Sequence, residues 1–309
     1  MSDLKLFKLA ANQVAELPAS SMALEKSLQS LIERHLETFL GVTFLASEHP
    51  TGPKTGGRLD TLGIDENGAL VIIEYKKASN ANVINQGLFY LDWLLDHRGD
   101  FELLVSKKIG AVKAANIDWS SPRLLCIAGD FSKYDLYAVG HMQRNIELIR
   151  YAKYGDDLLA LDLINRTSAP ASSGGSNAMG TVSNLVPKAV VSKSVSDYLA
   201  QADTELTDRF DALKAMILEL GDDVEMKTLK LYYAFRRLKN FACVEVHPQT
   251  RELVVYVKHP APASAQEEGF ARDVTAIGHF GTGNLELTIK TKVDIEKARH
   301  LIEASYEAN

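Results

Sequence analysis

An uninterrupted apolar run, Leu70-Val71-Ile72-Ile73, constrains the fold of this chain more than any other feature. A run without alternating polar residues is typical of a strand that is covered on both faces, and such strands belong to sheets with helices on each side. The run continues directly into Glu74-Tyr75-Lys76, so two charged side chains follow at the end of a buried strand. Charged residues are rarely placed there without a partner or a chemical role.

The first half of the chain alternates between helical and strand-like patterns. Ser20-Ser21 is the predicted N-cap of the first helix, and Gly41 is its predicted end. The order of helix, three strands, helix and strand predicts an α/β domain in which helices flank a mixed sheet. We predict helices over 24–39, 79–96, 107–115 and 132–143, and strands over 42–47, 58–64, 69–76, 101–105, 123–128, 146–151 and 158–164.

A stretch rich in Ser and Gly, from Thr167 to Asn177, separates this half from the rest. Such a composition is typical of a flexible linker. We predict a first domain over 1–165, a linker over 166–194 and a smaller α+β accessory domain over 195–309. The predicted helices of the accessory domain cover 194–220, 226–239 and 293–307, and its strands cover 241–247, 252–258, 271–278 and 284–291.

Composition limits the class of protein. The chain has 309 residues, 46% of them hydrophobic and 24% charged, which is ordinary for a globular protein. We see no secretory signal and no apolar run long enough to span a membrane, so we expect a cytoplasmic protein with no membrane partner. The net charge of -6 argues against non-specific coating of nucleic acid, although it allows a local basic groove. Cys126 and Cys243 each lie in an apolar stretch and are predicted to be buried and unpaired.

The register of the hairpin decides whether a third charged side chain, Asp60, lies on the same face as Glu74 and Lys76. Glu74 and Lys76 share a face, because side chains two apart on a strand point the same way. A two-residue turn at Asn67-Gly68 would pair 60 with 75 and place Asp60 on the opposite face. A three-residue loop over 66–68, with its glycine in the left-handed conformation, pairs 60 with 74 instead. We predict the three-residue loop, although Asn-Gly by itself favours the two-residue turn.

In that register, two carboxylates meet beside an ammonium group. Carboxylates without His or Cys suit a hard cation such as Mg²⁺ or Mn²⁺. A cation of this kind lowers the pKa of bound water and neutralises charge that develops on a phosphate. Asp60 and Glu74 are therefore the predicted metal ligands, and Lys76 is predicted to orient or help deprotonate water in phosphodiester hydrolysis.

These residues resemble the motif of a known nuclease family. Asp60 followed by Glu74-Tyr75-Lys76 resembles the D...ExK motif of the PD-(D/E)xK nucleases, with Leu59 where the family name has Pro. The predicted order of elements resembles their restriction-endonuclease-like core. The segment from Gln86 to Tyr90 resembles the QxxxY motif of the RecB-type branch. Within this family, the archaeal and actinobacterial mismatch endonucleases are most similar in two segments, G-R-L-D-T-L-G-I-D and V-I-I-E-Y-K-K.

The resemblance implies an endonuclease that depends on Mg²⁺ or Mn²⁺ and has nucleic acid, specifically DNA, as its partner. By resemblance, Asp60 and Glu74 bind the metal, and Lys76 activates water. Gln86 and Tyr90 support the site or contact the substrate backbone. The restriction fold often dimerises and exposed hairpins can pair, so the chain is also a candidate homodimer.

Further candidates lie close to this motif in the sequence. Many members of the family contribute an acid from the first helix; Glu25 matches it here, with Glu33 and Glu37 as competing candidates. Arg58 and Lys77 flank the acids and are candidate contacts to nucleic-acid phosphates, although ordinary surface charge explains them as well.

The second half of the chain is similar to a small domain of unknown function that follows such cores in bacterial proteins, on the basis of 278–283 and 301–306. Within the predicted helix 226–239, Lys230 and Arg237 are candidate nucleic-acid contacts on one side. An amphipathic helix with a solvated basic face explains the same pattern. The glycines of 278–283 are explained most simply by a hairpin turn, and a small-molecule enzyme that uses them has little further support.

Two functions remain open on the sequence alone. The first is a metal-dependent DNA endonuclease whose accessory domain recognises substrate or mediates assembly. The second is a non-catalytic nucleic-acid-binding or interaction protein that keeps the nuclease scaffold. An isolated E-x-K on a strand is usually a solvated ion pair. The order of Asp60, the hairpin and the Gln86 to Tyr90 segment favours the first function.

Overall fold

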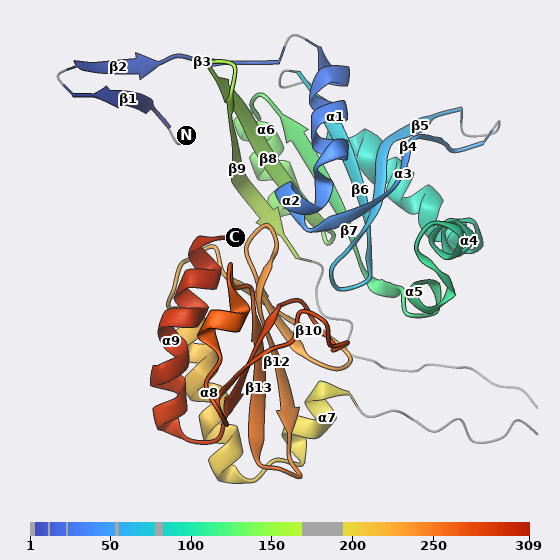
Figure 1. Ribbon diagram of the computed structural model, residues 1–309. Coiled ribbons are helices and arrows are strands. Elements are labelled where there is room, and N and C mark those ends of the chain that lie inside the picture. Colours follow the sequence, from blue (N-terminus) through green and yellow to red (C-terminus); the bar gives the residue numbers. More distant parts are fainter. Residues whose placement is uncertain (1–3, 12, 23, 53–55, 78–82, 169–193) are drawn as a thin grey trace, which may run out of the picture. The chain divides into compact units, whose positions relative to one another are not determined.

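The computed structural model (Figure 1) describes residues 4–11, 13–22, 24–52, 56–77, 83–168 and 194–309. The chain divides into two compact units, Met1–Ser176 and Asn177–Asn309. Each unit has its own hydrophobic core. Of the linker expected over 166–194, the part from 169 to 193 lies outside the described residues.

The first unit is built on a seven-stranded mixed sheet in the order β3-β8-β7-β6-β5-β4, with β9 beside β8. β6, β7 and β8 run parallel to one another, and the other pairs are antiparallel. β6 is buried on both faces, as its apolar run predicts. The strands are β3 (Ala19–Ser20), β4 (Val42–Pro50), β5 (Arg58–Asp65), β6 (Ala69–Lys76), β7 (Asp118–Ala128), β8 (Asn145–Tyr154) and β9 (Leu158–Thr167).

Helices cover both faces of this sheet (Figure 1). α1 packs on β5 and β6 from one side, where Glu33 accepts a hydrogen bond from Thr61. α3 packs on the opposite side, where Gly87 lies directly against the Leu124 side chain of β7. The confirmed fold class is therefore α/β with a mixed sheet between helices. The helices are α1 (Glu25–Arg34), α2 (Leu36–Leu40), α3 (Val83–Asp96), α4 (Arg98–Ile109), α5 (Ala111–Ala115) and α6 (Lys133–Gly140).

Several predicted boundaries in this unit are wrong. Ser20 belongs to β3, and α1 begins after Leu24, so Ser20-Ser21 is not the N-cap. The strand predicted over 101–105 is part of α4, where Phe101 and Val105 are one helical turn apart and both buried. Residues 166 and 167, assigned to the linker, pair with β8 as the end of β9. Gly41, with a φ of 62°, does end the helical segment as predicted.

A separate two-stranded sheet precedes this core. β1 (Leu6–Ala10) and β2 (Gln13–Leu17) pair only with each other among the strands of the described residues, and the sequence patterns did not predict them.

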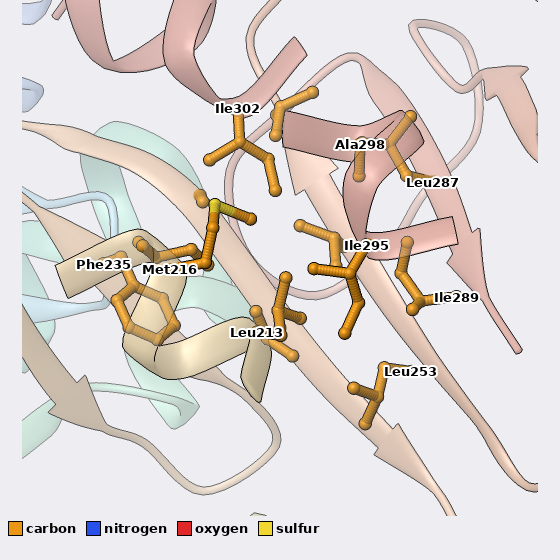
Figure 2. Packing of buried hydrophobic residues seen from close by; sticks show 14 of the residues in the cluster. Leu213, Met216, Phe235, Leu253, Leu287, Ile289, Ile295, Ala298 and Ile302 are labelled. Atoms are coloured by element: carbon orange, nitrogen blue, oxygen red, sulfur yellow. The ribbon is translucent and has the colours of Figure 1, made fainter. Parts of the chain in front are cut away.

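The second unit is a six-stranded antiparallel sheet in the order β10-β11-β12-β13-β15-β14, with helices packed on one face. Figure 2 shows how Leu213 and Met216 of α8 and Ile295, Ala298 and Ile302 of α9 meet the strand side chains in its core. The elements are α7 (Val195–Ala200), α8 (Thr204–Leu218), β10 (Glu225–Thr228), β11 (Tyr233–Arg236), β12 (Asn240–His247), β13 (Glu252–Val257), a 3-10 helix (Pro262–Ala265), β14 (Ala271–Asp273), β15 (Leu285–Ile289) and α9 (Lys292–Glu307).

Two predicted helices of this unit are wrong. The helix expected over 194–220 is two helices, because Asp203 caps a new one by accepting a hydrogen bond from the Leu206 backbone N–H. The helix expected over 226–239 is the β10–β11 hairpin. The predicted β12–β13 hairpin is present, and the 278–283 glycines lie in the loop that joins the antiparallel strands β14 and β15.

Both cysteines, Cys126 and Cys243, are buried and free, as predicted. Among the described residues, no helix combines the length and the apolar character needed to cross a membrane.

Candidate active site

The hairpin between β5 and β6 has the predicted odd register. Thr61 pairs with Ile73, and Ile64 pairs with Leu70. The same register, extended by one residue at each end, places residue 65 opposite 69 and residue 60 opposite 74. The loop is therefore the three residues 66–68, and Gly68 has a φ of 81°. This left-handed conformation is one that glycine adopts without strain. The register places Asp60, Glu74 and Lys76 on the same face of the sheet.

The carboxyl groups of Asp60 and Glu74 accept backbone hydrogen bonds from the opposite strand at the point where β5 and β6 stop pairing. Regular pairing ends at Thr61 and Ile73. One residue further, the Asp60 backbone N–H donates to Glu74 Oε1 at 3.2 Å, and the Tyr75 backbone N–H donates to Asp60 Oδ2 at 3.0 Å. Side-chain oxygens thus take the place of strand-to-strand hydrogen bonds, which fixes both carboxyl groups next to each other.

The Glu74 carboxyl is held in an environment that disfavours its negative charge. Glu74 is fully buried, and its Oε2 has no hydrogen-bond partner among the described residues. Burial, followed by the neighbouring charge of Asp60, raises the pKa of Glu74 to about 8. Burial also raises the pKa of Asp60, against the opposing effects of the Tyr75 N–H and Lys76. Two such carboxylates ionise together readily only when positive charge approaches them.

Lys76 supplies one positive charge at this site. Its Nζ lies 3.5 Å from Glu25 Oε2 at the first turn of α1, and its charge lowers the pKa of both Asp60 and Glu74. Of the three helical acids considered, only Glu25 is seen to contact Lys76 among the described residues. The Glu33 carboxylate accepts from Thr61 Oγ1 at 2.6 Å, and that of Glu37 accepts from Thr43 Oγ1 at 3.0 Å.

Gln29 is a site residue that the sequence patterns did not reveal. It is 4% exposed, and its Nε2 donates to the backbone carbonyl of Asp60 at 2.7 Å and to Ser47 Oγ at 3.2 Å. It therefore ties α1 to β4 and β5 beside the acid. The available signal was a polar residue next to Leu28 and Ile32 on the buried face of the helix.

The QxxxY-like residues form one hydrogen-bonded pair on α3. Gln86 Nε2 donates to the Tyr90 hydroxyl at 3.3 Å. The Tyr90 ring is nearly buried and lies against Gly57, where an added Cβ would come within 2.6 Å of the ring. The pair therefore supports the chain just before β5, the strand that carries Asp60.

The acidic pair fits a hard cation with few protein ligands. Within the part of the chain that the structure describes, no group of three or more His, Cys, Asp or Glu side chains is arranged to hold a metal ion. Asp60 and Glu74 supply two carboxylates, and Glu74 Oε2 has no hydrogen-bond partner among the described residues. Mg²⁺ is commonly bound by one or two carboxylates while water and substrate oxygens complete its coordination. The residues present therefore match this type of ion.

The predicted basic contacts are in different environments. Arg58 is exposed, and its Nε lies 3.5 Å from Glu48 Oε2. Lys77 is also exposed and directly follows the end of β6. Lys230 is exposed in the turn between β10 and β11, and Arg237 pairs with Asp223 at 2.6 Å. The helix expected to carry Lys230 and Arg237 is absent, so they do not share a helical face.

Two solved structures resemble the chain. One is the crystal structure of a repair endonuclease from Pyrococcus abyssi, with 19% identity, a TM-score of 0.27, and coverage of 44% of this chain and half (50%) of that one. The other is a complex of EndoMS with double-stranded DNA, with 15% identity, a TM-score of 0.29, and coverage of 48% of this chain and 64% of that one.

Sequence comparisons match the second unit and, with one relative, nearly the whole chain. Residues 195–309 match a domain of unknown function, DUF5655. The chain is 30% identical over 302 residues to an uncharacterized protein from Haemophilus influenzae (strain ATCC 51907 / DSM 11121 / KW20 / Rd). The aligned region spans 97% of this chain and 98% of that protein. This chain therefore belongs to the same protein family as the Haemophilus influenzae protein, over nearly the whole length of both.

Proposed function

We propose that the first unit is a metal-dependent nuclease that hydrolyses phosphodiester bonds in DNA. The observation that carries this proposal is the Asp60–Glu74 pair, whose two carboxyl groups share one end of a buried strand with Lys76. Burying two acids together is unfavourable unless a cation or a reaction uses them. The motif resemblance supports nucleic acid as the substrate class.

Each residue has a role in this proposal. Asp60 and Glu74 hold Mg²⁺ or Mn²⁺, which lowers the pKa of water and offsets charge on the phosphate when bound. Lys76 orients the attacking water, and Glu25 holds the Lys76 ammonium group. Gln86 and Tyr90 fix the chain that leads into β5.

Basic side chains complete the proposed nucleic-acid contacts. Arg58 and Lys77 are the candidates in the first unit, and Lys230 and Arg237 are those in the second. For the second unit, we propose a role in substrate recognition or assembly, including assembly as a homodimer, in the cytoplasm.

The second candidate function is binding of nucleic acid without cleavage. The Glu74 pKa of about 8 favours it, because at neutral pH and without a cation this carboxyl is largely protonated and has to lose its proton before it binds metal. Cleavage therefore requires that a cation displaces this proton.

An assay on defined substrates separates the two functions. Single-stranded, branched and duplex DNA are incubated with Mg²⁺ or Mn²⁺ and the wild-type chain, Asp60→Ala or Lys76→Ala. We expect cleavage by the wild type and by the control Lys107→Ala, which changes an exposed lysine of α4, and no cleavage by Asp60→Ala or Lys76→Ala. DNA binding by all variants with no cleavage by any of them would support the non-catalytic function, and equal cleavage by all would exclude this site.

A further inference from the structure

The hairpin that carries Asp60 and Glu74 has two competing registers, and the apolar pattern of β6 does not choose between them. Every residue of β6 from Ala69 to Tyr75 is buried, so both faces of the strand are equally suited to a core. A one-residue slip exchanges the two faces. It would place Tyr75 rather than Glu74 opposite Asp60. Another feature must therefore select the observed register.

The Asn67-Gly68 sequence of the turn favours the register that the structure does not have. Asn-Gly prefers a two-residue type I′ turn, which would pair 66 with 69 and 60 with 75. In the structure, Asp65 instead organises a three-residue loop. Its Oδ1 accepts hydrogen bonds from the backbone N–H groups of Asn67 and Ala69, both at 2.9 Å. Its backbone carbonyl accepts from the Gly68 N–H at 3.0 Å.

The second carboxylate oxygen of Asp65 enters a buried ion network. Arg123 Nη1 donates to Asp65 Oδ2 at 2.9 Å, and the same guanidinium donates to Glu147 through Nε and Nη2 at 2.8 and 3.0 Å. These three side chains are at most 4% exposed. Burial alone would lower the pKa of Arg123, but Glu147 and Asp65 raise it, so the guanidinium stays charged.

The network can form in only one register. Arg123 is the β7 neighbour of Val71, which pairs with Gly63 of β5, so Arg123 and Asp65 lie on the same face. After a one-residue slip of β5 along β6, Asp65 would face the other side of the sheet. Arg123 would lose a partner in a dry environment, which is strongly unfavourable.

We propose that Asp65, anchored by Arg123, is a positioning residue that selects the register in which Asp60 meets Glu74. Its effect on catalysis rests on the proposed nuclease function, whereas its effect on the register does not. The role is distinct from general stabilisation because it acts through the pairing of one hairpin.

A change in loop length tests the proposal. Deletion of Glu66 leaves a two-residue Asn67-Gly68 turn with 65 still opposite 69, so Asp60 stays opposite Glu74 without help from the Asp65 carboxylate. In the full chain, we expect Asp65→Ala to lower kcat about tenfold with KM unchanged, because fewer molecules hold the active register. The number of Mn²⁺ ions bound per chain falls in parallel. Combining Asp65→Ala with the Glu66 deletion restores kcat to within about twofold.

Two comparisons keep the result interpretable. Asp156→Ala changes an exposed acid in the β8–β9 turn and is expected to leave kcat unchanged. If Asp65→Ala does not fold, Asp65→Asn keeps an oxygen for the loop but removes the charge that pairs with Arg123. We expect Asp65→Asn to give an intermediate kcat that the Glu66 deletion also rescues.

The register itself is measured by cross-strand NMR contacts, with Thr61 opposite Ile73 in the observed pairing and opposite Glu74 after a slip. Full retention of the Thr61–Ile73 contact in both Asp65 variants would overturn the proposal. A wild-type chain that neither cleaves DNA nor binds Mn²⁺ would overturn the nuclease function alone, because the register measurement requires no activity.

Discussion

The Glu74 carboxyl links the proposed chemistry to stability. Its folded-state pKa is about 8, raised first by burial and then by Asp60. In the unfolded chain, an ordinary Glu has a pKa of about 4.3. Between these two values the folded state binds more protons than the unfolded state, so the free energy of unfolding falls as pH rises through this window.

Replacing Glu74 with Gln should remove this pH dependence. We expect the free energy of unfolding of Glu74→Gln to match that of the wild type near pH 5 and to exceed it by about 4 kcal/mol above pH 8 in metal-free buffer. Urea denaturation at several pH values, with a chelator present, measures the difference. Glu102→Gln, at an exposed position of α4, is the control and should show no such trend. A constant difference between Glu74→Gln and wild type across pH would show that Glu74 ionises normally.

Lys76 separates cation binding from catalysis. If its ammonium group orients water, Lys76→Met should lower the cleavage rate by about 100-fold or more. Because its charge lowers the pKa of Asp60 and Glu74, its loss should also move Mn²⁺ binding to higher pH without abolishing it. Calorimetric titration with Mn²⁺ at several pH values tests this, with Lys107→Met as the matched control. Loss of Mn²⁺ binding at every pH would instead make Lys76 a structural residue.

At the level of single residues, the sequence predicted which charged groups lie together within one hairpin. Asp60, Glu74 and Lys76 could be placed together because strand periodicity and hairpin register are local rules. Gln29 could not be placed in the same way, because it reaches the site through a hydrogen bond to the backbone carbonyl of Asp60. A helical pattern does not specify which distant backbone atom a side chain contacts.

Among the elements, the approach of α3 to the start of β5 is unusually close. A Cβ at Gly57 would lie 2.6 Å from Tyr90 Cε1 and 2.7 Å from its hydroxyl oxygen. We expect Gly57→Ala to destabilise the fold by about 1–3 kcal/mol, because the ring has to move. Tyr90→Leu should reduce this penalty, so that the double variant is less destabilised than the sum of the two. The free energy of unfolding in urea is the measurement.

Gly99 provides the matched control for this substitution. It lies in α4, and an added Cβ meets no atom within 4 Å. Because alanine is the better helix former, Gly99→Ala should be neutral or stabilising by up to about 1 kcal/mol. Equal destabilisation by both substitutions would mean that contact with Tyr90 does not explain the result.

Elements that depend on tertiary context were the ones predicted wrongly. Phe101, Leu104 and Val105 form a short apolar cluster that fits a strand as well as a helix. Helix α4 buries Phe101 and Val105 on one side, which only the surrounding core decides. In 226–239, the basic and aromatic residues suggested an amphipathic helix. The structure instead places Tyr233 and Phe235 on one face of β11, two residues apart, in the core.

At the scale of the whole molecule, the two cores predict separate unfolding. The core of the second unit is closed by α8 and α9 against its own sheet, and residues 195–309 alone match DUF5655. We therefore expect a fragment of 194–309 to fold and unfold cooperatively in isolation. Its melting temperature should coincide with one of two transitions in the full chain, as measured by calorimetry.

Mn²⁺ should then stabilise only the other transition. A ligand that binds the folded state stabilises it by about 2.7 kcal/mol at a hundred times its Kd. For a unit of this size, such a gain raises the melting temperature by about 5–10 °C. The shift should disappear in Asp60→Ala, while the transition of the second unit should stay in place in both proteins. A shift of both transitions, or one that survives Asp60→Ala, would locate the cation outside the Asp60–Glu74 pair, because binding energy appears in the unit whose folding creates the site.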